Sequence, residues 1–305
     1  MIGPLPSDEG PPPARSGASR ARRVAGFVVG VLLFAAAVWV IARSGADLRA
    51  SLDAARAAHW AVVASVVGLP VLNWLLISVS FRVLQSRYAP VGWVEMGALI
   101  GSAWLLNYLP MKPGMLGRFA YHKHVNGIRY ADSARVLVIS VGLTALSIGA
   151  LLLIALLVQV SDPAWGWAWC LPVPVGLALA STLLAPRGPW AWRLAVAGLM
   201  RYLDMMVWVG RYAAAFALVG SPLDFRTSVL VAAVSQVALM VPISGNGLGV
   251  REWGVRLASS PIGLLADVVN RAAEVTVALP IGVVGSLWAA RRLSRARPTG
   301  TAAAG

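Results

Sequence analysis

Residues 241–252 read V-P-I-S-G-N-G-L-G-V-R-E, and this stretch decides how the rest of the chain is interpreted. It lies between strongly apolar runs, yet it contains a proline, three glycines, a serine, an asparagine and an adjacent arginine and glutamate. In hydrocarbon an unpaired backbone amide or carbonyl costs several kcal/mol, so irregular chain survives there only where protein or a water-filled cavity surrounds it. A helix broken at membrane depth therefore predicts a binding site, because the ends of the half-helices point into the gap.

A related pattern occurs 132 positions earlier in the chain. The residues P-M-x4-L-G beginning at Pro110 align without gaps with P-I-x4-L-G beginning at Pro242, and an arginine follows each, at Arg118 and Arg251. Two apolar segments interrupted by proline and glycine in corresponding halves are typical of an internally repeated, transporter-like fold.

The composition predicts an all-α polytopic membrane protein. The chain has 305 residues, of which 58% are hydrophobic and only 12% charged, whereas a soluble domain averages about 25% charged residues. The net charge is +14, from 26 Lys and Arg against 12 Asp and Glu. These basic residues are scattered between apolar segments, so we do not expect nucleic acid as a partner. They are interpreted as cytoplasmic anchors that fix the topology or as attraction to anionic lipid.

The apolar segments and the positive-inside rule predict six full transmembrane helices and two re-entrant hairpins open to opposite faces, an inverted-repeat arrangement. The six spans are expected at residues 24–42, 60–81, 136–160, 165–185, 194–219 and 270–290, and the hairpins at about 91–124 and 227–258. We expect one transmembrane domain, residues 24–290, with repeat-like halves at about 60–160 and 194–290. Residues 1–23 are predicted to be a disordered tail and residues 291–305 a second tail, both on the cytoplasmic side of the plasma membrane.

Residues 109–127 read L-P-x-K-P-G-x-L-G-R-x-x-Y-x-x-x-x-x-G. Together with residues 241–252 and Arg271, this motif resembles the membrane region of lysylphosphatidylglycerol synthases, and more closely the stand-alone members of that superfamily. Met115 stands where the family's first motif usually has a glutamate. In two-domain relatives this region translocates the aminoacylated lipid made by a following soluble transferase domain. Only fifteen residues follow Ala290, so we do not expect lysyl transfer, and the resemblance implies a lipid-handling membrane module.

The candidate binding residues lie first at the two breaks. At the first break, Lys112 and Arg118 could hold a phosphate beside freed amides at a helix N-terminus. Arg118 is preferred because a guanidinium binds phosphate bidentately, and the alternative is that both are topological anchors. At the second break, glycines allow close backbone approach while serine and asparagine supply side-chain donors. The candidates there are Ser244, Asn246, Gly247 and Gly249, and the alternative is a tight turn that caps two half-helices.

Charged residues follow the second break and recur in the last span. Glu252 and Arg256 are four positions apart, so we expect them to pair on one helical face. Arg251 lies elsewhere on that helix and is expected to be free to face the cavity. Arg271 and Glu274 are three positions apart in the last span, which favours structural pairing.

A stripe of charge also runs along the span at residues 194–219. Arg201, Asp204, Trp208 and Arg211 fall on one helical face, and charges at this depth should face protein or water. Asp204 can neutralise one of the two arginines. Two interpretations stay open, structural pairing and an electropositive wall along which an anionic headgroup moves.

The leading functional hypothesis is a flippase-like translocase that moves a phospholipid or polyprenyl-phosphate-linked headgroup across the bilayer. The alternatives are a membrane lipid-linked glycosyl transferase or a partner subunit of one, and a secondary transporter of a small anion. Asp47 and Asp53 are six positions apart on different helical faces, which argues against an enzyme. His122 and His124 diverge and have no accompanying carboxylate or cysteine, so we expect neither a metal nor another cofactor. The expected partners are membrane lipids with anionic or phosphate-bearing headgroups, and a homo-oligomer or a separate lipid-modifying enzyme stays open.

Overall fold

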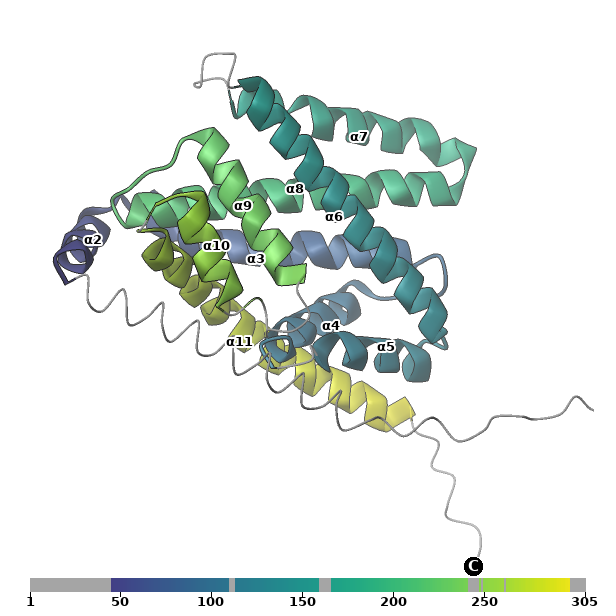
Figure 1. The fold of residues 1–305 in the computed structure, drawn as a ribbon. Coiled ribbons are helices and arrows are strands. Elements are labelled where there is room, and N and C mark those ends of the chain that lie inside the picture. Colours follow the sequence, from purple (N-terminus) through teal and green to yellow (C-terminus); the bar gives the residue numbers. More distant parts are fainter. Residues whose placement is uncertain are drawn as a thin grey trace, which may run out of the picture.

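The computed structural model describes residues 45–109, 113–158, 166–240, 247, 249–260 and 262–296. The described residues are helical apart from short connections and contain no strand, which confirms the all-α prediction (Figure 1). The helices are α2 (Gly45–Ala57), α3 (Trp60–Gln85), α4 (Trp93–Leu106), α5 (Pro113–Val125), α6 (Tyr130–Val158), α7 (Pro172–Leu184), α8 (Pro189–Leu218), α9 (Phe225–Met240), α10 (Val250–Ala258) and α11 (Gly263–Ala296). The predicted span at residues 24–42 and both predicted tails, except the first few residues of the second, lie outside the described residues.

Three of the described helices are long and apolar enough to cross a membrane: Trp60–Gln85, Tyr130–Leu157 and Gly263–Arg295. A crossing takes about 20 predominantly apolar residues, so these helices fit a membrane protein. Helix α8 is also long, with 30 residues, but it contains charged side chains that are buried against other helices. The six-span arrangement stays a prediction.

The described helices repeat one order of lengths. A long helix, two short helices and another long helix occur as α3 to α6 and again as α8 to α11, with α7 between the two sets. Helix α4 begins at Trp93 and α9 begins at Phe225, 132 positions later, the same offset that separates the two proline breaks. The other helix starts follow this offset to within a few residues, for example Tyr130 of α6 and Gly263 of α11.

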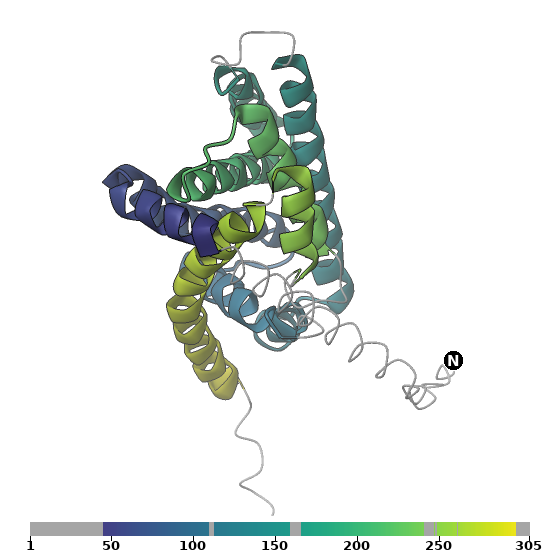
Figure 2. The ribbon, with the colours of Figure 1, turned by 60° about the vertical axis from the view of Figure 1, so that its left-hand side comes forward.

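The contacts between helices repeat in the same way when each helix of the first half is replaced by its counterpart in the second half. Within each half the first long helix packs on the first short helix, the two short helices pack on each other, and the second short helix packs on the second long helix. Between the halves, α3 packs on α8, while α4 packs on α11 as α9 packs on α6 (Figures 1 and 2). This matched set of contacts is what an approximate two-fold relation between the halves produces. How the halves are oriented across a membrane stays a prediction.

The short helices form two hairpins. At 1.5 Å per residue, the 14 residues of α4 span about 21 Å and the 16 residues of α9 about 24 Å, less than the ~30 Å thickness of the hydrocarbon core. The second break contains Gly247 and Gly249 with φ of 71° and 79°, a left-handed conformation that glycine adopts without steric cost. Whether the hairpins enter from opposite membrane faces stays a prediction.

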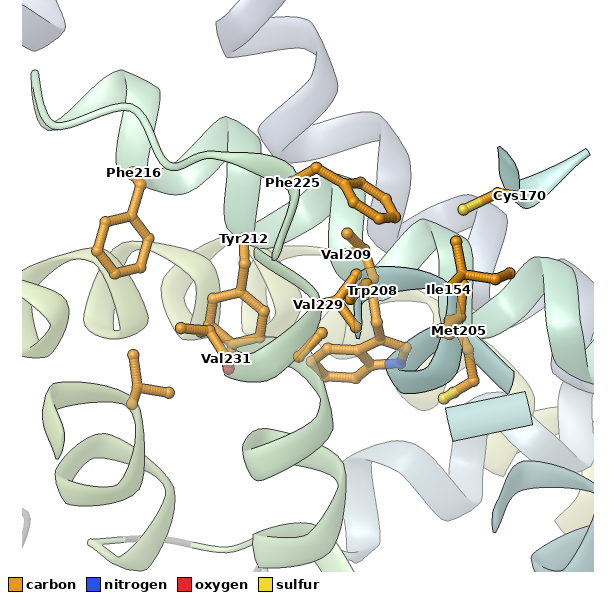
Figure 3. Packing of buried hydrophobic residues seen from close by; sticks show 14 of the residues in the cluster. Ile154, Cys170, Met205, Trp208, Val209, Tyr212, Phe216, Phe225, Val229 and Val231 are labelled. Atoms are coloured by element: carbon orange, nitrogen blue, oxygen red, sulfur yellow. The ribbon is translucent and has the colours of Figure 1, made fainter. Parts of the chain in front are cut away.

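One apolar core joins α8 to α6 and α9 (Figure 3). Trp208, Tyr212 and Phe216 project from α8 at successive helical turns and pack with Val229 of α9 and Ile154 of α6. All of these side chains are almost completely buried. This packing fixes the face of α8 that carries the buried charges.

Helices α4 and α11 approach so closely that glycine is required at their contact. A Cβ atom at Gly285 would lie against the backbone of Ala98, and one at Gly282 against Leu105. Gly101 of α4 meets Ile281 of α11 in the same way. Gly97 and Gly101 are four positions apart in the sequence, a small-xxx-small pattern, and Gly101 allows the close helix packing that such patterns serve in membrane helices.

We predict that Gly285→Val destabilises the protein by about 1–3 kcal/mol, because the added side chain meets backbone that cannot rotate away. Thermal unfolding in detergent micelles measures the effect. The matched control is Gly149→Val in α6, where nothing lies within 4 Å of an added Cβ. An equal loss of stability in both variants would contradict the role of close packing.

Candidate functional site

The centre of the described structure is a group of buried charges on α8, α10 and α11. We call it the arginine–carboxylate cluster, and its members are Arg211, Arg251, Arg271, Glu252, Asp267 and Glu274. None of these residues is more than 6% exposed. Three arginines face three carboxylates, so the cluster as a whole is formally neutral. Neutrality is a physical requirement here, because an uncompensated charge in a low-dielectric interior is very costly.

Glu274 of α11 is the carboxylate shared by most partners. Its Oε2 lies 2.9 Å from Nη2 of Arg211 and 3.3 Å from Nη1 of Arg251. Its Oε1 accepts a hydrogen bond of 3.1 Å from the Tyr108 hydroxyl. Tyr108 directly precedes the first proline break, and Arg251 directly follows the second. The two breaks therefore connect to each other through one carboxylate.

Asp267 holds the other side of Arg251. The Arg251 Nε lies 3.1 Å from the Asp267 carboxylate, and the Tyr212 hydroxyl lies 2.7 Å from both Asp267 Oδ1 and the Ser235 hydroxyl. A phenol has one proton, so Tyr212 donates to the carboxylate and accepts from Ser235. The remaining pair joins Glu252 to Arg271 at 2.7 Å.

Two asparagines complete the coordination of Arg211. Its Nε donates to Asn270 Oδ1 and its Nη1 to Asn73 Oδ1, both at 3.0 Å. Asn73 of α3 in turn donates to Asp204 Oδ1 at 2.6 Å. Asp204 pairs with Arg201 at 3.3 Å, so polar contacts continue along α8 from the cluster to Arg201.

Phe81 of α3 lies between two arginines from different helices. The guanidinium carbon of Arg118 is 3.9 Å from the centroid of the Phe81 ring, and that of Arg201 is 5.0 Å from it. Arg118 is 8% exposed and, within the described ranges, has no ion-pair partner. A cation–π contact contributes about 0.5–2 kcal/mol, which is less than the cost of burying an unpaired charge. We call this place the Phe81 site, formed by Phe81, Arg118 and Arg201.

Six of the candidate residues named from the sequence lie in these two groups or connect them. They are Arg118, Asp204, Arg211, Arg251, Glu252 and Arg271, and all are buried. The predicted pairing of Asp204 with an arginine of its stripe is confirmed by the contact with Arg201. Gly247 and Gly249 lie in the second break. Lys112, Ser244 and Asn246 lie outside the described residues.

Two expectations about α10 are wrong. Glu252 pairs with Arg271 of α11 rather than with Arg256, because Glu252 faces the interior while Arg256 is partly exposed and lies over the Trp253 ring at 5.0 Å. Arg251 is not free to face a cavity, since it is fully buried between Asp267 and Glu274.

Sequence reasoning missed several members of the site. Counted from Asp267, the residues Asn270, Arg271 and Glu274 follow at spacings of three, four and seven, which place them on one face of α11. This periodic stripe of polar residues in an apolar helix indicates a buried polar face and could have been found from the sequence. Asn73 and Tyr108 gave weaker signals. Asn73 is the polar residue in the apolar stretch of α3 between Ser65 and Ser78, and Tyr108 is a tyrosine two positions before a proline. Within the described ranges, no three histidine, cysteine or carboxylate side chains are grouped as metal ligands.

Comparisons with profiles of protein families, with curated proteins and with solved structures found no match to this chain. The resemblance of residues 109–127 and 241–252 to lysylphosphatidylglycerol synthases therefore stays a prediction. The two groups of buried charge are therefore the features of this chain from which its function is inferred.

We predict that Glu274→Gln destabilises the protein by about 3–5 kcal/mol, because it leaves Arg211 and Arg251 with less negative charge than their burial requires. Glutamine keeps the size of the side chain and an acceptor for Tyr108. The free energy of unfolding is measured in mixed micelles of increasing denaturing detergent. The control is Asp53→Asn, which breaks the exposed pair with Arg56 and should change stability little. Similar stabilities of the two variants would contradict the proposed importance of the cluster.

Proposed function

We propose that this protein is a lipid translocase that moves a phosphate-bearing headgroup from one leaflet to the other. The observation that carries the proposal is the Phe81 site, where Arg118 is buried without an anion among the described residues. Asp204 already neutralises Arg201, and the arginine–carboxylate cluster is neutral by itself. Among the buried charges that the described parts of α5, α8, α10 and α11 place in these two groups, Arg118 therefore supplies an unbalanced positive charge.

A phosphate diester matches this excess charge. Guanidinium groups bind phosphate oxygens through charge-assisted, often bidentate hydrogen bonds. A single negative charge next to Arg118 makes the Phe81 site neutral, whereas a cation would add to the repulsion between Arg118 and Arg201. The site therefore selects anions.

Polar side chains continue from the Phe81 site to both breaks. Arg201 contacts Asp204, Asp204 contacts Asn73, and Asn73 contacts Arg211. Arg211 then reaches Glu274, which also holds Tyr108 and Arg251. This series offers a headgroup successive polar partners across an otherwise apolar protein, while its acyl chains stay in the lipid.

Movement along this series exchanges one anionic partner of an arginine for another instead of leaving the arginine unpaired. A phosphate that approaches Arg211 or Arg251 replaces Glu274 as the partner of that arginine, and Glu274 keeps the other arginine. Tyr108, next to the first break, and Arg251, next to the second, both bind Glu274. A change in the position of Glu274 therefore affects both breaks at once. A bound headgroup shifts the conformational equilibrium to the extent that it binds one arrangement better than the other. The resemblance of the two break motifs to a lipid-handling family supports the same function.

We predict that the reconstituted protein accelerates the flip-flop of labelled anionic phospholipid and that Arg118→Gln slows it by about tenfold or more, since a hydrogen bond to a charged group is worth about 1.5–3 kcal/mol. Flip-flop is measured by bleaching the fluorescent lipid in the outer leaflet. Arg118→Lys should give an intermediate rate, because it keeps the charge and loses the bidentate geometry.

The control variant is Arg129→Gln, which removes an arginine with a mostly exposed side chain, paired with Asp132. It should keep the rate of the unmodified protein. No acceleration over protein-free vesicles with phosphatidylglycerol, phosphatidylethanolamine and a polyprenyl phosphate would overturn the proposal. Uptake of radioactive inorganic phosphate in the absence of lipid flip-flop would instead identify a transporter of small anions.

A further inference from the structure

Besides the two groups of buried charge, the structure contains a groove of about 560 Å³ between helices α3, α4 and α11. This volume is within the range of about 300–1,000 Å³ typical of ligand pockets. The wall is formed mainly by apolar side chains, among them Trp74, Leu75, Trp93, Val94, Val284 and Trp288. The groove is separate from both groups of buried charge.

Two polar groups of the groove wall, on Trp74 and Ser78, are already satisfied within the protein. The indole N–H of Trp74 donates to the Gly97 carbonyl at 3.0 Å, and the Ser78 hydroxyl donates to the Trp74 carbonyl at 2.7 Å. A polar occupant would lose its own hydrogen bonds to water without replacement from these groups. The groove therefore suits a hydrocarbon chain.

One end of the groove is basic. Helices α4 and α11 are antiparallel, since Gly101 meets Ile281 and Ala98 meets Gly285, and this register brings Trp93 and Trp288 to the same end. Arg82 lies 3.7 Å above the Trp93 ring and Arg292 lies 5.2 Å above the Trp288 ring. Neither arginine has an ion-pair partner within the described ranges.

We propose that this groove binds one acyl chain of an anionic glycerophospholipid, with the lipid phosphate beside Arg82 and Arg292. Tryptophan and arginine at one end of an apolar surface are the arrangement found where a membrane meets water. The stretch of α11 that lines the groove, from Pro280 to Trp288, rises about 12 Å at 1.5 Å per residue. This length is close to half of the ~30 Å hydrocarbon thickness, so the groove matches the acyl region of one leaflet.

The position of the groove connects it to the proposed translocation. Two of the helices that line it, α3 and α11, also supply Asn73 and Glu274 to the polar series, and the turn that follows the third, α4, supplies Tyr108. We assign the groove as the place where the lipid substrate binds before its headgroup reaches the Phe81 site. This role in transport rests on the proposed function, whereas lipid binding in the groove does not.

The test uses the full chain in vesicles of phosphatidylcholine that contain phosphatidylglycerol with a photoreactive diazirine on one acyl chain. Labelled peptides are located by mass spectrometry. The expected labels lie on α4 near Val94 and on α11 between Pro280 and Trp288. Val284→Trp fills the groove and should lower this labelling about tenfold. Val283→Trp, an equally bulky change at an exposed neighbouring position that does not line the groove, should leave it unchanged.

A second pair of variants tests the basic end. Arg292→Gln should reduce labelling by phosphatidylglycerol to the level of diazirine-labelled phosphatidylcholine, while Arg295→Gln, one turn further along α11, should not. Uniform labelling of the groove and of other exposed apolar positions, such as Leu152 and Leu156 of α6, would overturn the proposal in favour of bulk lipid contact.

The chain's own residues 24–42 are the competing occupant. In a Cys170→Ser background, a cysteine at position 94 is combined with a single cysteine moved through residues 27–38. Efficient disulfide formation at any of these positions would overturn the proposal. Groove labelling measures binding at equilibrium, so it can succeed when flip-flop is absent and fail when flip-flop is present. The two proposals are therefore contradicted by different results.

Discussion

The structure depends on the requirement that buried charges be balanced where they lie. Glu274 meets this requirement for two arginines at once, and it also accepts a hydrogen bond from Tyr108. Helices α8, α10 and α11 and the turn after α4 each bring one of these groups to the same place. The segments before the first break and after the second are consequently held by a single carboxylate, which ties the two halves of the chain together more specifically than apolar packing does.

The two halves repeat their helices but not their charges. Helices α3 to α6 and α8 to α11 share order, lengths and contacts, yet the arginine–carboxylate cluster is built entirely from the second set. The first set contributes Asn73, Tyr108, Phe81 and Arg118. Two similar halves thus enclose a polar interior. Its charges are balanced at the arginine–carboxylate cluster, whereas the Phe81 site has excess positive charge. The apolar groove lies outside this interior and is lined by α3, α4 and α11.

The sequence predicted the coarse structure well because hydrocarbon places strong limits on a chain. Apolar length and the periodic stripe that includes Arg201 and Asp204 each have one simple structural solution, and the Arg201–Asp204 pair is confirmed. Pro110 and Pro242 of the two breaks lie outside the described residues. The pairing of Glu252 could not be predicted in this way. Its spacing to Arg256 favours a local pair worth a few tenths of a kcal/mol, whereas burial against α11 makes Arg271 the stronger partner. Spacing along one helix does not reveal which side chains a neighbouring helix presents.

The glycine contact between α4 and α11 has a mechanical consequence. The side chains of Ile281 and Leu105 seat against Gly101 and Gly282 of the opposite helix, and the backbone of Ala98 seats against Gly285. Either separating or sliding the two helices would lose these dispersion contacts. We therefore expect α4 and α11 to move together as one rigid unit. Such a unit keeps Tyr108, which follows the end of α4, within hydrogen-bond reach of Glu274 on α11.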